Sequence, residues 1–187
     1  MITEAAARAA LQQAELICDT DEVCAAVAQL AHEINQKLGG AHPLVLSVMG
    51  GAAVFTGQLL PLLNFPLDFD YIHVSRYGNQ EYGSALRWVV EPDEETVRGR
   101  VVLVLDDILD QGETLAAIKE RIAVMGASAC YCAVFAEKSS GELKAARADF
   151  VGLHLPDRFV FGFGMDYHGA WRNLPAIYAM KSTRGGY

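Results

Sequence analysis

The feature that most constrains this chain is an uninterrupted apolar run, Val101–Leu105, followed at once by Asp106 and Asp107. Five β-favouring residues without polar alternation are typical of a central parallel strand that helices cover on both faces. Adjacent carboxylates at the end of such a strand repel each other, so a cation or a hydroxyl donor should hold them. The segment therefore predicts an α/β fold with a ligand at the carboxyl end of a buried strand.

The loop after this strand has the composition of a phosphate site. It consists of Asp110, Gln111, Gly112, Glu113 and Thr114. Gly112 permits backbone conformations that other residues resist, Thr114 supplies a hydroxyl, and the free N–H groups of a helix predicted over residues 115–125 begin there. This combination suits a phosphate monoester. The GxxxxGK[ST] loop is absent and no GxGxxG follows an early strand, so neither a Walker site nor a dinucleotide site is predicted.

Together the acid pair and the loop predict a ribose-phosphate site. Vicinal ribose hydroxyls, aided by Mg²⁺, would satisfy the two carboxylates. One alternative is a pair of solvated acids at a strand end. Another is the acidic pair of a receiver domain, but such pairs normally lie near the N-terminus and lack a Gly-x-Thr loop directly afterwards.

The rest of the chain alternates strands with helices, which indicates a largely parallel sheet. We expect a single domain, residues 1–187. Its N-terminal segment, residues 1–40, should hold two helices, one capped by Thr3 and running to about Cys18, and one capped by Thr20 and ended by Gly39. Further helices are predicted over residues 52–63 and 115–125. Strands are predicted over residues 43–49, 67–74, 87–90, 101–105, 129–136, 150–153 and 159–161.

Charge and composition exclude several classes of function. The formal net charge is −8 with fifteen Lys and Arg, which argues against a general nucleic-acid binder. No apolar run approaches the roughly 18 residues needed to span a bilayer, and the N-terminus lacks the apolar core of a signal peptide. The four cysteines form no CxxC, which suits a reducing compartment. We therefore expect a cytoplasmic protein without a membrane or nucleic-acid partner.

The segment Val101–Leu115 resembles the phosphoribosyl-pyrophosphate (PRPP) signature of type I phosphoribosyltransferases. The resemblance extends over roughly Leu44 to Lys181, and the tail is similar to the hypoxanthine-guanine branch. Its further matches are the Gly50-Gly51 turn, a polar stretch from Ser75 to Gly83, Lys138 after a strand, and the tail segments Pro156–Tyr167 and Trp171–Pro175.

The resemblance implies a fold, an activity and partners. The fold would be a mostly parallel central sheet flanked by helices, with a small hood from the N- and C-terminal segments, in which residues 150–187 bind the base. The activity would be purine salvage, the transfer of a 5-phosphoribosyl group from PRPP to hypoxanthine or guanine, giving IMP or GMP and pyrophosphate. Mg²⁺ would be the cofactor. The protein would be a homo-oligomer, a dimer or a tetramer as its relatives are.

Roles for PRPP binding follow by resemblance. Asp106 and Asp107 would bind the ribose hydroxyls, directly or through Mg²⁺, and the loop from Asp110 to Thr114 would hold the 5′-phosphate. Asp166 would also bind Mg²⁺. Pyrophosphate would meet Met49, Gly50, Gly51 and Arg172. A mobile lid over residues 75–86, with Ser75, Tyr77 and Gly78, would close the site and carry in Arg76.

Base recognition follows by resemblance too. Asp110 would be the general base near purine N7, Lys138 would contact O6, Phe159 would stack on the base, and Val160 and Asp166 would lie toward its 2-position. The chemistry agrees, because a 6-oxopurine needs a donor at O6 and a base for a ring proton. Taken singly, Lys138 could be a surface lysine, Phe159 and Phe161 core aromatics, and Arg172 a partner stacked on Trp171.

Two residues depart from the family pattern. Gly50 stands where the family usually has Lys or Arg, and Arg76 stands where it usually has Ser. By resemblance the Met49–Gly50 peptide is expected to be cis, with Gly50 easing the crowding around it. Our hypothesis is that Arg76 replaces part of the missing positive charge. The alternative functions are a PRPP-sensing regulator of the same fold, which would want a basic face, and an enzyme preferring xanthine or a pyrimidine.

Overall fold

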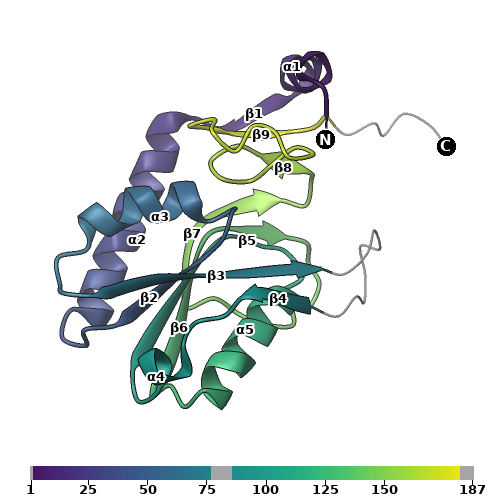
Figure 1. Cartoon of the computed structure of the whole chain (residues 1–187). Helices are drawn as coiled ribbons and strands as arrows, with labels where there is room; N and C mark the ends of the chain where they lie inside the picture. The colour runs from purple at the N-terminus through teal and green to yellow at the C-terminus, as the bar shows by residue number, and fades with distance from the viewer. Residues whose placement is uncertain (1, 77–85, 182–187) are drawn as a thin grey trace.

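A computed structural model of the chain describes residues 2–76 and 86–181. Strands and helices alternate along much of the chain, although β4 follows β3 directly and the last four elements are all strands (Figure 1). The elements are α1 (Glu4–Gln13), β1 (Glu15–Cys18), α2 (Thr20–Leu38), β2 (Leu44–Val48), α3 (Ala53–Leu59), the 3-10 helix η1 (Leu60–Leu62), β3 (Asp68–Arg76), β4 (Leu86–Val90), α4 (Glu94–Val97), β5 (Val101–Leu109), α5 (Glu113–Val124), β6 (Ala129–Ser139), β7 (Phe150–Pro156), β8 (Val160–Phe161) and β9 (Ile177–Ala179).

The main sheet has six strands in the order β4-β3-β2-β5-β6-β7. All neighbours are parallel except β4, which is antiparallel to β3 at the edge. β5 pairs on both sides, Leu103 with Val45 of β2 and with Tyr131 of β6. The apolar run thus forms a central strand, and the predicted α/β fold with a mostly parallel sheet is confirmed.

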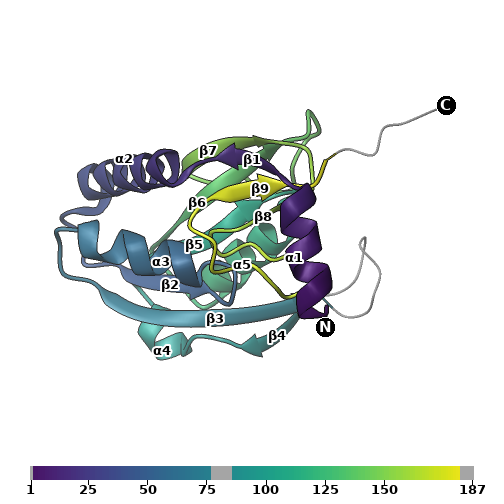
Figure 2. The same ribbon diagram turned by 90° about the horizontal axis from the view of Figure 1, so that it is seen from above.

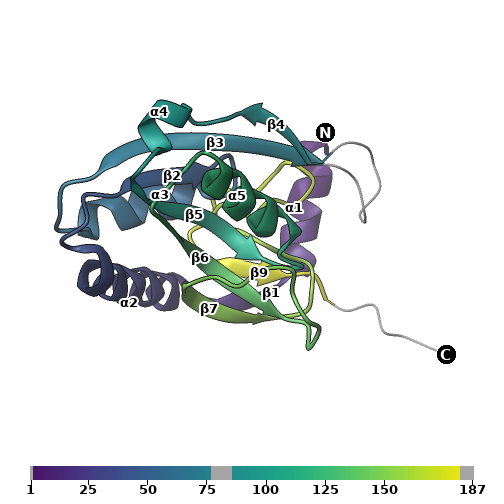
Figure 3. The same ribbon diagram turned by 90° about the horizontal axis from the view of Figure 1, so that it is seen from below.

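Side-chain alternation divides the core between the two faces of this sheet. Leu103 and Leu105 of β5 pack in one cluster with α2 and α3, and Val102 and Val104 pack in the other with α5. All four residues are fully buried. The views from above and below show α2 and α3 on one side of the sheet and α5 on the other (Figure 2; Figure 3). Helices on both faces explain why this strand carries no polar residue before Asp106.

A second, three-stranded sheet joins the two ends of the chain. Its order is β1-β9-β8, with all pairs antiparallel, so that Glu15 and Val160 both pair with Ala179. Figure 1 shows this sheet above the main sheet, with α1 beyond it. This is the small hood of N- and C-terminal segments that the resemblance implied, and we call it the hood below.

The N-terminal helices differ from the prediction in their bounds. Thr3 does cap α1, since its hydroxyl accepts a hydrogen bond from the Ala6 N–H, but α1 ends at Gln13. The residues expected to continue it form strand β1, because pairing with β9 outweighs their helical spacing. The second helix is capped by Asp19, one residue before the expected Thr20, through a capping box with Glu22.

Another difference lies among the acids after β4. No helix was predicted there, but these acids lead into the short helix α4, which Asp93 caps by accepting the Glu95 N–H. The strand predicted over residues 87–90 is β4, which lies at the edge of the sheet and carries Trp88. None of the helices in residues 2–76 and 86–181 is long and apolar enough to cross a membrane.

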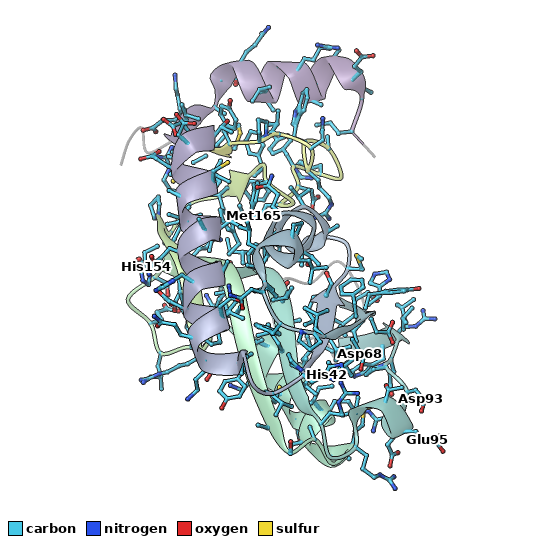
Figure 4. The ribbon with its side chains drawn as sticks, turned by 90° about the vertical axis from the view of Figure 1, so that its left-hand side faces the viewer. His42, Asp68, Asp93, Glu95, His154 and Met165 are labelled. Atoms are coloured by element: carbon cyan, nitrogen blue, oxygen red, sulfur yellow. The ribbon has the colours of Figure 1, made fainter. Side chains whose placement is uncertain are left out.

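The two ends of the main sheet carry different chemistry. At the amino ends of β2 and β3, His42 lies 3.6 Å from Asp68, whose carboxylate also accepts a 2.8 Å hydrogen bond from Arg100. The Arg100 hydrogen bond lowers the pKa of Asp68. These charged side chains therefore pair with one another on the exposed surface. Figure 4 shows His42 and Asp68 far from Met165, which lies beneath the hood. The acid pair Asp106 and Asp107 lies toward the opposite, carboxyl end of β5, in a cavity that Arg172 also lines.

Candidate active site

Two adjoining cavities lie between the carboxyl ends of the main strands and the hood. The larger, about 420 Å³, reaches from the turn after β2 to the loop before α5 and to Arg172 of the hood. The smaller, about 160 Å³, lies between Lys138 and Phe159. Their common wall consists of Asp107, Ile108, Asp110 and Asp166. A ligand with two chemically different parts would fit this arrangement, with one part in each cavity.

Asp106 and Asp107 lie inside β5 and not after it, because the strand stays paired with β6 as far as Leu109. Asp106 is only 9% exposed, and its carboxylate accepts the Asp107 N–H at 3.0 Å. Burial, then repulsion from Asp107, raises the pKa of Asp106 well above its ordinary value. Burial also raises the pKa of Asp107, although the charge of Arg172 opposes the shift. A bound cation or hydroxyl donors would relieve this arrangement.

The predicted phosphate loop has the backbone of an anion site. Gly112 has φ +81° and is the N-cap of α5, which no side chain of the described residues caps. A Cβ at Gly112 would lie 2.8 Å from the backbone nitrogen of Ala146, so only glycine fits. The loop is held from behind, where the Ala145 N–H donates to the Gln111 carbonyl at 2.9 Å and the Lys144 ammonium donates to the Asp110 carbonyl. Its N–H groups at the helix start are therefore preorganised.

Asp110 of the common wall forms an ion pair with Lys138, which lines the smaller cavity. Their Oδ2 and Nζ atoms are 2.7 Å apart, and the side chains are 44% and 16% exposed. Lys138 is therefore no surface lysine, and it lies within β6 rather than after a strand. The pair places a hydrogen-bond donor directly beside an acceptor at the smaller cavity.

Two phenylalanines of the hood have different environments. Phe161 is fully buried, as a core aromatic should be, whereas Phe159 is 50% exposed and lines the smaller cavity. The Phe159 ring is held by Tyr167, edge-on at 5.7 Å, and by His168, nearly parallel at 6.3 Å. Val160 beside it is buried and lines the same cavity. Phe159 thus offers a supported aromatic surface to a flat ligand.

The turn after β2 passes close to the acid pair. The Met49–Gly50 peptide is cis, as expected. A Cβ at Gly51 would lie 1.9 Å from Oδ2 of Asp107, and a Cβ at Gly164 would lie 2.1 Å from the Gly51 carbonyl oxygen. At Gly50 a Cβ would have no described atom within 4 Å. The expectation that Gly50 eases crowding is therefore wrong, and the residue that the packing requires to be glycine is Gly51.

Arg172 and Asp166 bring a second set of charges to the larger cavity. The Arg172 guanidinium donates to the Gly164 carbonyl at 2.6 Å and lies 2.6 Å from Oδ1 of Asp166. Oδ2 of Asp166 accepts the Gly169 N–H at 2.7 Å. Within the described part of the chain, no three His, Cys, Asp or Glu side chains form a metal-binding group. A metal ion held here would thus need substrate oxygens and water to complete its shell.

Part of the expected lid lies outside the described residues. Ser75 pairs with Arg87 and Arg76 with Leu86 at the end of the β3–β4 ladder. Tyr77 and Gly78, and the side chain of Arg76, are outside what the structure describes.

Several residues near the cavities were not singled out as site residues from the sequence. His73 and Ile108 line the larger cavity, His168 supports Phe159, and Lys144 supports the phosphate loop. His73 and Ile108 lie at the carboxyl ends of β3 and β5, which is the one cue that could have found them. His168 and Lys144 reach their partners from irregular segments, where sequence spacing does not indicate direction.

Comparison with known proteins agrees with this geometry. The family model described as "Phosphoribosyl transferase domain" matches residues 13–168. The hypoxanthine-guanine phosphoribosyltransferase of Bacillus subtilis is 32% identical over 167 residues, which cover 89% of this chain and 93% of that protein. A crystal structure of a hypoxanthine-guanine phosphoribosyltransferase from Bacillus anthracis superposes with a TM-score of 0.82 at 28% identity, covering 88% of this chain and 97% of that one.

The chain therefore belongs to the phosphoribosyltransferase family. Within that family its similarity lies with the hypoxanthine-guanine branch, as the signature segment and the tail indicated. The chain is also 33% identical over 167 residues to the bifunctional protein TilS/HprT of Listeria innocua, of whose length it spans 26%. Members of the family generally use Mg²⁺ with PRPP. The match begins at residue 13, so β1 and α2, in which no resemblance was expected, are part of it, whereas α1 precedes it almost entirely.

Proposed function

We propose that this protein salvages purine bases by transferring the 5-phosphoribosyl group of PRPP to hypoxanthine or guanine. The observation that carries the proposal is the pair of adjoining cavities, one with a phosphate loop and the other with a cation–carboxylate pair and an aromatic surface. In the reaction the bond from ribose C1 to the pyrophosphate oxygen breaks, and a bond from C1 to a purine nitrogen forms. The products are IMP or GMP and pyrophosphate.

The larger cavity suits the sugar and its phosphate. The N–H groups of the Gly112 loop and the Thr114 hydroxyl would hold the 5′-phosphate at the start of α5. The carboxylates of Asp106 and Asp107 would accept hydrogen bonds from the ribose hydroxyls. These contacts would hold C1 near the common wall of the two cavities, where the base would attack.

The Lys138–Asp110 ion pair suits the edge of a 6-oxopurine. O6 and N7 are neighbours on this edge, and the 2.7 Å pair presents a donor beside an acceptor. Lys138 would donate to O6, and Asp110 would accept the proton that leaves the ring as the purine nitrogen attacks. Phe159 would stack on the base. An adenine amino group would meet the Lys138 ammonium as donor against donor, which disfavours 6-aminopurines.

The acid pair also fits a divalent cation. Asp106 and Asp107 are adjacent and buried and have raised pKa values, as expected of carboxylates that a cation would otherwise satisfy. Asp106 and Asp107, and Asp166 by resemblance, would each be able to supply a ligand to Mg²⁺. Substrate oxygens and water would complete the shell, since the three side chains do not form a metal-binding group by themselves. When bound, Mg²⁺ supplies neutralising charge for the pyrophosphate. Arg172 and the backbone of Met49, Gly50 and Gly51 would contact the same leaving group.

Further parts of the proposal concern the whole protein. Residues 75–86 would form a lid that excludes water from the carbocation-like sugar, with Arg76 adding positive charge. If so, Arg76→Ser raises the KM for PRPP several-fold, the order of effect of one charge pair, and unchanged PRPP kinetics would make Arg76 a solvated residue. We also propose one domain over residues 1–187 with a base-binding hood over residues 150–187, a cytoplasmic location and a homo-oligomer.

The test is a set of initial rates with PRPP, Mg²⁺ and five bases: hypoxanthine, guanine, xanthine, adenine and uracil. The proposal expects turnover of hypoxanthine or guanine with release of pyrophosphate. Fastest turnover of xanthine would move the protein to another base preference. Binding of PRPP without turnover of any base would identify a PRPP-sensing protein and contradict the proposal.

A further inference from the structure

We infer that α1 and Trp171 act as a support for Arg172, so that Trp171 is a positioning residue for PRPP binding. This inference rests on the proposed function, in which Arg172 contacts the pyrophosphate part of PRPP. It assigns a role to the N-terminal helix, which lies almost entirely before the residues that the family model matches.

The support is a hydrogen bond across the length of the chain. The Trp171 indole N–H donates to the backbone carbonyl of Ala7, in the middle of α1, at 2.7 Å. Ala7 and Ala10, one turn apart on α1, are both buried. In the view from above, α1 runs beside the hood strands (Figure 2). The helix is therefore fixed against the hood and can hold the indole in one orientation.

The backbone of Trp171 is itself constrained. Its φ is +70°, in the left-handed region that bulky residues rarely adopt. Such a conformation persists only where surrounding contacts impose it, and the indole hydrogen bond to α1 is such a contact. Because Arg172 follows directly, the same backbone conformation sets the direction in which the arginine leaves the chain.

This constraint limits the orientations open to Arg172. Its guanidinium donates to the Gly164 carbonyl, and its own backbone carbonyl accepts the Gly164 N–H at 2.9 Å. Arg172 lines both the larger active-site cavity and a groove of about 490 Å³ between α1 and residues 169–173. Open space on the side of α1 would let the long Arg172 side chain swing away from the larger cavity. A fixed backbone limits this movement, so Arg172 loses less conformational entropy when it binds an anion.

The central experiment compares Trp171→Phe with the parent by calorimetric titration of PRPP in the presence of Mg²⁺. Phenylalanine keeps the aromatic ring but removes the N–H donor. We expect PRPP to bind about threefold to tenfold more weakly, the effect of one lost hydrogen bond, with the KM for the base unchanged. The matched control is Trp88→Phe on edge strand β4, which should bind PRPP as the parent does.

A double-mutant cycle with Arg172→Gln tests whether Trp171 acts through Arg172. If it does, Trp171→Phe has no further effect on PRPP affinity in the Arg172→Gln background. An equal loss in both backgrounds would overturn the inference, and so would parent-like PRPP binding by Trp171→Phe or by Arg172→Gln.

A second pair of variants tests α1 without altering Trp171. Ala10→Asp places a charge at a buried position of α1, and Ala9→Asp places the same charge at an exposed one. We expect Ala10→Asp alone to weaken PRPP binding, again without effect in the Arg172→Gln background. Parent-like binding by an Ala10→Asp protein whose melting temperature has fallen would overturn the inference. A parent that binds PRPP but converts no base would refute the proposed function and leave this test intact.

Discussion

At the residue scale, Asp110 is the proposed general base. Its carboxylate lies in the wall that the two cavities share, and its backbone begins the phosphate loop. Asp110→Asn keeps the shape but cannot take a proton. We expect kcat to fall by about 10²-fold or more, the usual loss for a general acid–base group, with a smaller effect on PRPP binding. Steady-state kinetics measures both, and a kcat within threefold of the parent would remove Asp110 from catalysis.

Lys138 is the second residue whose surroundings define a test. Only 16% of its side chain is exposed, and its ammonium faces the smaller cavity beside Asp110. Lys138→Met removes the donor for O6 and should cost base use about tenfold to a hundredfold in kcat/KM, as for a lost charged hydrogen bond. PRPP affinity, measured separately by calorimetry, should change little. Equal losses for base and PRPP would assign Lys138 to the fold or to the pyrophosphate.

At the scale of an element, the turn after β2 offers a matched pair of substitutions. Gly51→Ala would place a methyl group 1.9 Å from the Asp107 carboxylate, whereas Gly50→Ala meets no described atom within 4 Å. We expect Gly51→Ala to lose at least about tenfold in PRPP affinity, because the turn or Asp107 must shift. Gly50→Ala should retain the parent's affinity. Calorimetry on both variants decides, and similar affinities for the two would contradict the described turn.

The same scale shows which elements sequence could predict. β5 and α5 carry their own signals, an unbroken apolar run and a glycine loop before a helix, so the carboxylates and the phosphate loop follow from residues close in the chain. β1 and β9 have four and three residues, and they are strands only because they pair with each other across the chain. No local pattern encodes that pairing, and the helical spacing before Cys18 suggested a longer α1 instead.

The candidate site, like the fold, was only partly predictable from the sequence. Residue types and order placed Asp110 in a predicted phosphate loop, whereas Lys138, Phe159 and Arg172 were assigned to the site through the family resemblance. Their spatial relations arise from packing between distant segments. The Lys138–Asp110 ion pair joins strand β6 to the loop after β5, and the Trp171–Ala7 hydrogen bond spans 164 positions. The crowding at Gly51 instead of Gly50 likewise depends on how the turn meets Asp107.

At the scale of the whole molecule, the acid pair should make stability depend on pH. The folded protein raises the pKa of Asp106 and of Asp107, so it binds protons more tightly than the unfolded chain. The stability contributed by these protons is complete below the ordinary carboxyl pKa of about 4 and is lost as pH rises through the raised values. In Asp106→Asn this side chain no longer titrates, so the stability that Asp106 loses as pH rises is not lost in the variant. At neutral pH, without Mg²⁺ or PRPP, we expect its melting temperature to exceed the parent's by at least about 2–4 °C, which corresponds to roughly 1 kcal/mol.

Two further measurements make that prediction specific. The difference in melting temperature between Asp106→Asn and the parent should shrink as the pH is lowered. Addition of Mg²⁺ and PRPP should stabilise the parent more than the variant, because ligand binding to the folded state raises stability by mass action. A variant less stable than the parent at neutral pH would show that the Asp106 carboxylate stabilises the fold.

The contact between Gly51 and Gly164 has a mechanical consequence. The carbonyl of Gly51 lies so close to Gly164 that no side chain separates the turn from the hood, and Gly51 in turn touches Asp107 of the main sheet. Side chains can deform to absorb a movement, but backbone in direct contact transmits it. A movement of the Gly164 segment toward the sheet should therefore displace the turn as well. We expect substrates to enter and products to leave past the opposite wall, where β3 and β4 border the larger cavity through Val74 and Leu86.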